Sequence, residues 1–313
     1  MDATDVGATD VAHVPEEPRG CVVCIGVFDG VHRGHQSLIA LGRAAADRLG
    51  VPLVAVTFDP HPMAVVGPRT PPKSLASMRV REELLHGAGA DEVDVLRFDE
   101  AMSQLTPEDF IQQLLVDRLH VKGVVVGEDF HFGHRAAGSV DTLRSEGARH
   151  GFEVIPAPLV GAPGERWSST SIRTMVEAGD VEGAAEALGR LYCLAGTVVH
   201  GDHRGRELGY PTANLDPDGD PAMPADGVYA GWLNWSGQVL PAAISVGTNP
   251  TFHGAQRRAE AYVLDRDDLE LYGEPVRLEF AHRIRGMETF ESVAELVERM
   301  EVDITEARSL LSA

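Results

Sequence analysis

The chain has 313 residues, enough for two domains, because a single hydrophobic core seldom grows beyond roughly 250–300 residues. Its 48 acidic and 27 basic residues give a formal net charge of -21, and no basic run concentrates positive charge, so we expect no nucleic-acid partner. Residues 1–19 are acidic and lack an apolar stretch that could act as a signal peptide or membrane span. We expect a disordered tail on a cytoplasmic protein that has no membrane partner.

The first apolar run, CVVCIGVF at 21–28, contains a C-x-x-C pair formed by Cys21 and Cys24. That spacing is compatible with a redox or zinc site. The run is apolar and β-branched, however, which indicates a buried strand. Residues three apart on a strand face opposite sides and lie about 10 Å apart at ~3.3 Å per residue, too far for a disulfide. We therefore favour a structural strand here.

The rest of the first half alternates strand-like runs with helical patterns. Apolar runs occur at 53–58, 93–98, 122–127 and 152–156, and helical spacing of apolar residues occurs at 35–49 and 107–119. Alternation of this kind predicts an α/β domain, in which helices wrap a parallel sheet. Ligands of such sheets bind where the carboxyl ends of strands meet the amino ends of helices.

After about residue 190 the pattern changes to strands without intervening helices. Strand-like segments separated by Gly, Pro, Asp and Asn clusters lie at 194–200, 227–233, 237–246, 258–265 and 274–280. They predict an antiparallel barrel, and the apolar spacing of 291–312 predicts an amphipathic helix packed against it. A helix that starts at Asp180 and is stopped by Gly189 precedes the change. We expect domains at 20–188 and 189–313.

The stretch GVFDGVHRGH, residues 26–35, joins the first strand to the first helix. Its glycines let backbone N–H groups approach a ligand closely, and a helix amino terminus favours an anion. His32 and His35 are three apart and would face the same way on a first helical turn. Two histidines without a third ligand nearby make a poor metal site. Donation of hydrogen bonds to a phosphate is the better interpretation.

Three more polar clusters follow later strands or open a helix: TFDPHP at 57–62, VGEDFHFGHRAAG at 126–138 and RWSSTSIR at 166–173. Taken singly, a residue such as Ser169 or Thr170 is more often a helix cap than a ligand. Four polar clusters at one edge of a sheet indicate a binding site instead.

In combination and order, H-x-G-H, G-x-D-F-x-F-G and S-S-T-x-I-R resemble the nucleotidyltransferase module of the prokaryotic bifunctional riboflavin kinase/FAD synthetase family. The resemblance implies a Rossmann-like domain that adenylylates FMN with ATP and releases pyrophosphate. It implies that His32 and His35 stabilise the transition state on the ATP phosphates. The expected ATP contacts are Gly26, Phe28, Asp29, Gly34, Asp129, Arg166, Ser169, Thr170 and Arg173, and those on the flavin side are His61, Phe130 and His131. Many relatives have Asn in place of Val27 and Arg in place of His131.

In the second half, the segment GTVVHGDHRGRELGYPTANL at 196–215 is the densest signal. Strand alternation aims Thr212 and Asn214 the same way, which gives two neutral oxygen ligands for a hard cation such as Mg²⁺. By itself PTAN is more typical of a turn before a strand than of a cation site. The segment resembles the flavokinase signature G-x-x-x-G-R-x-L-G-[FY]-P-T-A-N.

This second resemblance implies a six-stranded barrel that phosphorylates riboflavin with ATP, with Mg²⁺ held by Thr212 and Asn214. Glu260 would be the general base, although an exposed strand carboxylate fits the pattern equally well. The expected ATP-covering loop contains Gly201, Gly205, Arg206 and Gly209, and Arg285 would face the flavin.

Together the two resemblances predict an enzyme that makes FMN and then FAD from riboflavin and ATP with Mg²⁺, acting as a monomer or weak homo-oligomer. Two alternatives remain open: an adenylyltransferase for another phosphorylated substrate, and a flavin-binding carrier without catalysis.

Overall fold

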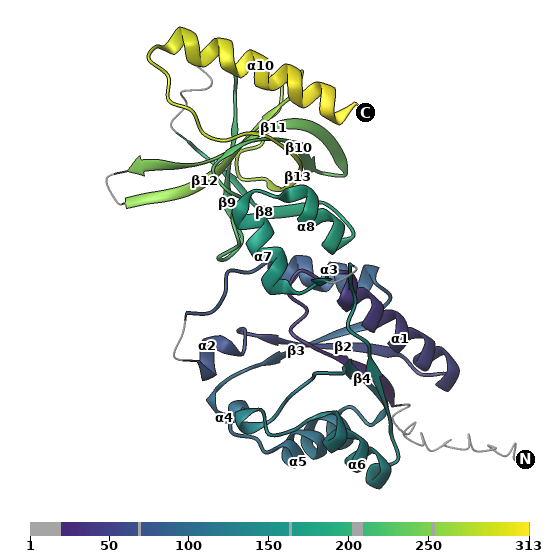
Figure 1. Ribbon diagram of the computed structural model, residues 1–313. Coiled ribbons are helices and arrows are strands. Elements are labelled where there is room, and N and C mark those ends of the chain that lie inside the picture. Colours follow the sequence, from purple (N-terminus) through teal and green to yellow (C-terminus); the bar gives the residue numbers. More distant parts are fainter. Residues whose placement is uncertain (1–19, 68–69, 163–164, 202–208, 252–253, 313) are drawn as a thin grey trace, which may run out of the picture.

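The computed structural model describes residues 20–67, 70–162, 165–201, 209–251 and 254–312, and the predicted tail at 1–19 lies outside them. Figure 1 shows an α/β body and a β-barrel body joined end to end, with helices α7 and α8 between them. No helix in the described part of the chain is both long and apolar enough to cross a bilayer.

The first body is built on a five-stranded parallel sheet in the order β3-β2-β1-β4-β5, with all four neighbouring pairs parallel. Its strands are β1 (Cys21–Ile25), β2 (Leu53–Asp59), β3 (Glu92–Arg97), β4 (Val121–Gly127) and β5 (Glu153–Ala157). Its helices are α1 (Arg33–Leu49), α2 (Met63–Val66), α3 (Met78–Gly87), α4 (Glu100–Ser103), α5 (Pro107–Phe110), the π-helix η1 (Ile111–Arg118), the 3₁₀ turn η2 (His134–Ala136) and α6 (Val140–His150). A two-stranded ribbon, β6 (Gly161–Ala162) and β7 (Glu165–Arg166), follows β5.

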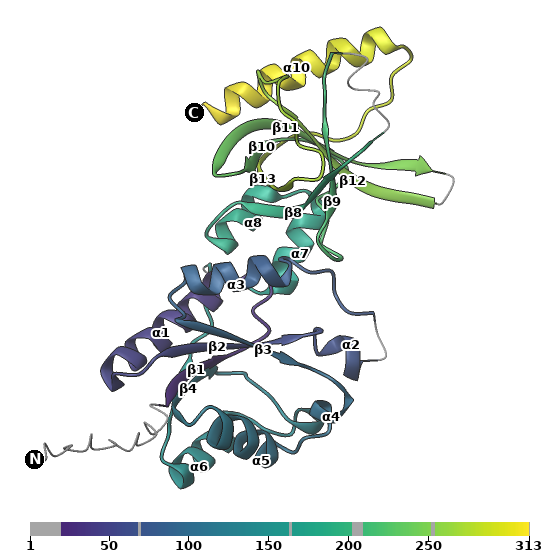
Figure 2. The ribbon, with the colours of Figure 1, turned by 180° about the vertical axis from the view of Figure 1, so that it is seen from behind.

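Helices cover both faces of this sheet, with α1 and α3 on one side and α4, α5 and α6 on the other (Figures 1 and 2). The two cysteines of the C-x-x-C pair separate accordingly: Cys21 packs in the core under α5 and η1, and Cys24 in the core under α1. Burial raises the pKa of Cys21 to about 12 and also raises that of Cys24, which keeps both thiols protonated. The pair is structural, as the strand pattern predicts.

The second body is a closed antiparallel barrel in the order β10-β11-β12-β9-β8-β13. Its strands are β8 (Tyr192–Val199), β9 (Ala213–Pro217), β10 (Gly227–Trp235), β11 (Gln238–Thr251), β12 (Gly254–Val263) and β13 (Pro275–Arg285). Helix α10 (Val293–Leu311) packs on the outside, where Ile304 and Ala307 contact a cluster that includes Leu264. Both predicted architectures, including the six strands and the C-terminal helix, are confirmed.

Two elements differ from the sequence-based expectation. The segment expected as one helix at 107–119 is a single α-turn, α5, that continues as the π-helix η1. Strand β9 was not among the predicted strands, because its sequence ANLDP is short and half polar. The PTAN stretch therefore leads into a barrel strand, and Asn214 stands within it.

Helices α7 (Ser169–Ala178) and α8 (Val181–Leu188) lie between the two bodies. Ser168 caps α7, Asp180 caps α8, and Gly189 ends α8 in the left-handed conformation. Their buried residues share one hydrophobic core with the barrel strands, since Ile172 and Leu188 belong to the same cluster as Tyr229 and Phe280. The predicted domain end at 188 coincides with the end of α8, yet both helices pack on the barrel.

The segment before α3 connects the two bodies directly. The backbone of Ser74 donates to the carbonyl of Asp220 at 3.0 Å and accepts from the N–H of Ala222 at 2.8 Å. Arg190, which follows α8, donates through its guanidinium to the carbonyl of Gly30 at 2.7 Å. The turn after β1 is thus bonded to the chain that enters the barrel.

Close packing of α1 on β1 yields a first prediction. A Cβ atom at Gly42 would lie 2.5 Å from Sγ of Cys24 and 2.8 Å from Cδ1 of Leu53. We expect Gly42→Ala to lower the free energy of unfolding by about 1–3 kcal/mol, because overpacking displaces the strand from the helix. The matched control is Gly87→Ala, where the new methyl group meets open space and stability should hold or rise by up to ~1 kcal/mol. Equal unfolding transitions for the two variants in urea would refute this packing argument.

Candidate active sites

The chain turns sharply between β1 and α1. Phe28, Gly30 and Val31 all adopt positive φ angles, of 52°, 77° and 39°. Left-handed conformations cost energy at residues with a Cβ, so such strain is retained where the surroundings enforce it and often where function needs it. Here the turn places His32 at the amino end of α1, at the carboxyl edge of the sheet.

His32 is the N-cap of α1. Its Nδ1 accepts a hydrogen bond from the backbone N–H of Gly34 at 3.1 Å, so the neutral ring carries its proton on Nε2. The ring stacks on that of His35, with centroids 3.7 Å apart and planes 22° apart. Phe28 meets His35 edge-on at 5.2 Å between ring centroids. The two histidine rings therefore lie side by side and face the same way, as their spacing predicts.

Burial lowers the pKa of His35 well below its usual range, and the nearby His32 and the positive charge of Arg81 lower it further. Its Nδ1 is buried and has no hydrogen-bond partner among the described residues. A neutral imidazole can donate one hydrogen bond and adds no charge of its own. Any charge that attracts an anion to this edge must therefore come from other groups.

A cavity of about 330 Å³ lies at the amino end of α1. Of the predicted ATP-binding residues, it is lined by Gly26, Phe28, His32, Gly34, His35, Asp129, Ser169 and Thr170, with Phe130 from the predicted flavin side. These residues come from the turn after β1, the loop after β4 and the first turn of α7. The structure thus brings together three of the four polar clusters.

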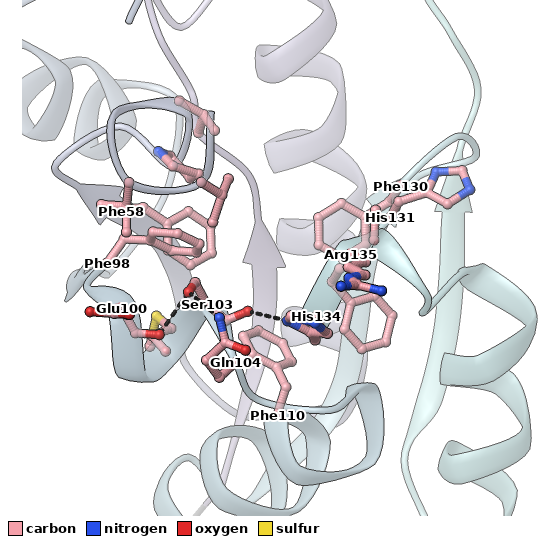
Figure 3. A pocket seen from close by; sticks show the side chains of 18 of the residues that line it. Phe58, Phe98, Glu100, Ser103, Gln104, Phe110, Phe130, His131, His134 and Arg135 are labelled. Atoms are coloured by element: carbon pink, nitrogen blue, oxygen red, sulfur yellow. Dashed lines mark hydrogen bonds between the residues drawn. The ribbon is translucent and has the colours of Figure 1, made fainter. Parts of the chain in front are cut away.

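A second cavity of about 920 Å³ lies beside the first and is rich in aromatic rings (Figure 3). Phe130 and Phe132 stack with centroids 5.6 Å apart, and Phe58 meets Phe98 edge-on at 5.7 Å. His131, for which a place on the flavin side is predicted, also lines this cavity. Gly26 and Phe130 line both cavities, so the two are adjacent.

Three residues predicted for this site line neither cavity, and the side chain of a fourth lies outside the described part of the structure. Asp29 and Arg173 do not line either cavity and instead form a buried ion pair at 3.2 Å. His61 lines neither cavity, and its Nδ1 accepts from the backbone N–H of Met63 at 3.1 Å. Arg166 lies in strand β7, and its side chain is outside the described part of the structure.

Sequence reasoning missed several residues of the two cavities. Phe58 and Phe98 end or directly follow the neighbouring strands β2 and β3, and Trp167 precedes the cap of α7. Their position after strands is a usable signal, because the carboxyl ends of parallel strands share one edge. His134 and Arg135 also line the larger cavity and belong to the polar cluster at 126–138, but their individual places depend on a loop in which Arg135 takes a φ of 56°.

In the barrel, Thr212, Asn214 and Glu260 lie together. Glu260 on β12 pairs in register with Asn214 on β9, and the hydroxyl of Thr212 donates to Oε2 of Glu260 at 3.2 Å. Asn214 is only 6 % exposed, and its Oδ1 has no hydrogen-bond partner in the described structure. A buried amide oxygen without a donor is costly unless a ligand completes it.

The predicted ATP-covering loop is described only at its two ends. Gly205 and Arg206 lie outside the described residues. Gly201 packs so closely on Asn214 that a Cβ atom there would lie 2.4 Å from the amide nitrogen. Gly209 adopts a φ of 87°, a conformation that favours glycine.

Arg285 was expected to face the flavin, but the structure gives it other partners. Its Nη2 contacts Oδ2 of Asp303 on α10 at 2.6 Å, and its Nε contacts both carboxylate oxygens at 2.9 and 3.0 Å. The side chains are 11 % and 5 % exposed. This buried bidentate pair fastens α10 to the end of β13.

The sequence matches two family models, "FAD synthetase" over residues 14–171 and "Riboflavin kinase" over residues 188–311. A bifunctional riboflavin kinase/FMN adenylyltransferase from Pseudomonas fluorescens is 38% identical over 94% of each chain. The protein of the same description from Escherichia coli K12 is 34% identical over 96% of each chain. A crystal structure from Streptococcus pneumoniae titled as a macrolide-efflux protein superposes with a TM-score of 0.85, at 35% identity and over 93% of this chain and 95% of that one.

The lowered pKa of His35 predicts how this ring titrates. In the unfolded chain it takes up a proton near pH 6.5, whereas in the folded protein it stays neutral to lower pH. Protons therefore bind preferentially to the unfolded state, and the contribution of His35 to stability falls as the pH drops below about 6.5. Imidazole ¹⁵N shifts of His35 should remain those of a neutral ring at pH 6, while the same ring in urea titrates normally. A folded-state midpoint near 6.5 would contradict this account of burial.

Proposed function

This chain belongs to the family of bifunctional riboflavin kinase/FMN adenylyltransferases, and from that premise we propose which of its residues perform each reaction. It phosphorylates riboflavin to FMN with ATP, and it adenylylates FMN to FAD with release of pyrophosphate. The FAD synthetase model covers the α/β body and the riboflavin kinase model covers the barrel. The adenylyl transfer is therefore assigned to the parallel sheet and the phosphorylation to the barrel.

For adenylyl transfer, ATP occupies the cavity at His32 and His35, and the flavin ring of FMN occupies the larger aromatic cavity. The observation that carries this assignment is that Gly26 and Phe130 line both cavities. When ATP and FMN bind on either side of these two residues, their reacting phosphates lie at the wall that the two cavities share. Stacked aromatic rings suit a flat tricyclic ring system.

The reaction forms a bond between a phosphate oxygen of FMN and the α-phosphorus of ATP and breaks the bond to the leaving pyrophosphate. No covalent enzyme intermediate is needed, so the protein acts by positioning and charge stabilisation. His32 donates from Nε2 to an α-phosphate oxygen, because its Nδ1 already accepts from Gly34. The neutral His35 beside it fixes the ring of His32 and can donate one further hydrogen bond.

The remaining predicted residues divide between contact and support. Asp129, Ser169 and Thr170 line the ATP cavity and contact the nucleotide, and Gly26, Phe28 and Gly34 let it approach the backbone. Asp29 and Arg173 form an ion pair that supports the turn between β1 and α1, and they do not touch the nucleotide. Arg166 closes on the phosphates from the ribbon before α7.

In the barrel, Glu260 is the general base that accepts the proton of riboflavin's terminal hydroxyl as this oxygen attacks the γ-phosphorus of ATP. Its support is its place beside Thr212, whose hydroxyl donates to it at 3.2 Å. The role of the predicted ATP-covering loop stays a prediction, because residues 202–208 lie outside the described part of the structure. Arg285 is better assigned to anchoring α10 than to binding flavin, because Asp303 occupies its guanidinium.

Mg²⁺ fits the oxygen atoms of this site. Oδ1 of Asn214 is buried and has no hydrogen-bond donor in the described structure. The hydroxyl of Thr212 donates a hydrogen bond to Glu260, which leaves a lone pair on its Oγ1 for a cation. Neutral oxygen ligands supplemented by substrate phosphates are the environment that Mg²⁺ usually takes in phosphoryl transfer. When bound, the cation would neutralise charge on the transferred phosphoryl group. We further propose that the protein works in the cytoplasm as a monomer or weak homo-oligomer.

Replacing both histidines should separate the two activities. In the double variant His32→Ala/His35→Ala, incubated with riboflavin, ATP and Mg²⁺, FMN should accumulate while FAD formation falls at least about a hundredfold, as expected for lost transition-state donors. Chromatography of the flavins over time measures both products. Loss of FMN formation instead would mean that the domains are assigned the wrong way round.

Replacing Glu260 tests its proposed role as the general base of riboflavin phosphorylation. Glu260→Ala should reduce FMN formation by about a hundredfold or more, yet convert supplied FMN to FAD at the parental rate. Glu279→Ala is a matched control on β13, a barrel strand that pairs with β8 and β10 and not with β12, since it removes an equally charged carboxylate away from Thr212. If both variants phosphorylate riboflavin equally well, Glu260 is an ordinary strand carboxylate.

The Mg²⁺ dependence of FMN formation tests cation binding by the barrel. Asn214→Ala removes the buried amide oxygen, so the Mg²⁺ concentration for half-maximal FMN formation should rise about tenfold, in line with the loss of one charge-assisted contact. The Mg²⁺ dependence of FAD formation from supplied FMN should not move. An unchanged Mg²⁺ curve for FMN formation would remove Asn214 from the cation site.

A further inference from the structure

Beneath the H-x-G-H turn lies a buried group of three charged side chains, Asp29, Arg81 and Arg173. Asp29 is 2 % exposed and Arg81 6 % exposed. Arg81 on α3 approaches Oδ1 of Asp29 at 3.5 Å, and Arg173 on α7 approaches Oδ2 at 3.2 Å. One carboxylate thus serves two guanidinium groups from two different helices.

The charges of this group do not balance. Two guanidiniums and one carboxylate leave a surplus of one positive charge, and Arg81 and Arg173 each keep a buried Nε without a hydrogen-bond partner in the described structure. Asp59, at the exposed end of β2, also acts electrostatically on Arg81, but no ion pair between them is formed. Burying an unpaired charge is costly, and protein interiors normally avoid it unless a ligand compensates.

The surplus charge is directed at the predicted ATP site. Both guanidiniums pair with Asp29, which stands three residues before His32, so they lie at the turn that leads to the amino end of α1. Burial lowers the pKa of His35, and the positive charge of Arg81 lowers it further. His35 is neutral, so it does not itself attract an anion. A triphosphate at the amino end of α1 is therefore attracted by the surplus positive charge of the group Asp29, Arg81 and Arg173 rather than by His35.

The same group also fixes the turn that carries His32. Asp29 accepts hydrogen bonds at Oδ1 from the backbone N–H groups of Leu75 and Ala76, at 2.9 and 3.3 Å. Its own carbonyl accepts from the hydroxyl of Ser169 at 2.9 Å. Arg81 helps hold the carboxylate in this position.

We propose that Arg81 is a positioning residue for adenylyl transfer, which shares Asp29 with Arg173 and leaves an unbalanced buried charge that strengthens binding of the ATP triphosphate. The proposal rests on the assignment of ATP to the cavity at His32 and His35. It concerns a residue on α3, outside every motif that identifies the site in the sequence.

The test compares three variants of the full-length protein. Arg81→Gln removes the charge but keeps an amide that can donate to Asp29, and Arg81→Lys keeps the charge but loses the planar fork. Arg79→Gln, on the same helix, removes an exposed arginine that pairs with Glu83 and Asp218. FAD formation from supplied FMN gives KM for each substrate and kcat, and riboflavin phosphorylation in the same preparation reports that the chain is folded.

For Arg81→Gln we expect KM for ATP to rise about tenfold, with KM for FMN changed less than about twofold. Calorimetry should show a larger loss of affinity for ATP than for AMP, because the triphosphate carries more negative charge. Arg81→Lys should stay within about threefold of the parent, and Arg79→Gln should match the parent. Since Arg81→Lys retains the charge, its agreement with the parent can be checked even where Arg81→Gln does not fold.

Equal increases in KM for ATP and FMN, a loss in Arg81→Lys as large as in Arg81→Gln, or equal losses for ATP and AMP would overturn the proposal and leave Arg81 as a structural clamp. These outcomes are separate from a failure of the ATP assignment itself. That failure would appear as undiminished FAD formation in the double histidine variant.

Discussion

The carboxylate of Asp29 is the contact on which the first active site depends. The carboxylate accepts hydrogen bonds from two backbone N–H groups before α3 and pairs with one guanidinium from α3 and one from α7. The backbone carbonyl of Asp29 accepts a hydrogen bond from Ser169, the first residue of α7. The strained turn at Phe28 and Val31 lies immediately on either side of it. Because the carboxylate is almost fully buried, these contacts are little screened by water, and the turn that presents His32 has one conformation to adopt.

The two cavities follow from the topology of the parallel sheet. Strand β1 lies in the middle, so the loop after it faces the loops after β2 and β4 on either side. The side of β2 and β3 supplies Phe58 and Phe98 to the aromatic cavity, and the side of β4 supplies Asp129 and Phe130. Two different substrates can therefore meet over one central strand end, without any movement of the strands themselves.

Much of the fold could be predicted from the sequence, and the reasons are specific. Apolar runs of β-branched residues and helical spacing are local signals, so the sheet, the barrel and α10 were foreseen, and the family match confirms the two activities. Strand β9 was missed because ANLDP is short and half polar. His32 and His35 were singled out by their spacing in a turn that contains glycines, whereas Arg81 was not, because nothing in the sequence shows that this arginine of α3 is buried. Arg285 was assigned to the flavin for the same reason: its partner Asp303 is distant in sequence and joins it only in the folded barrel.

The two reactions are assigned to different bodies, but helices α7 and α8 share a hydrophobic core with the barrel, so the two bodies are not structurally independent. The residues proposed for the two reactions lie in different bodies, yet Ile172, Val176 and Leu188 are buried in one core with barrel residues such as Phe280. A chain cut after residue 188 would keep every predicted adenylyl-transfer residue and still present these apolar side chains to water. The helix that carries the proposed ATP contacts Ser169 and Thr170 thus packs on the barrel, so the barrel acts as a scaffold for part of the site proposed in the α/β body.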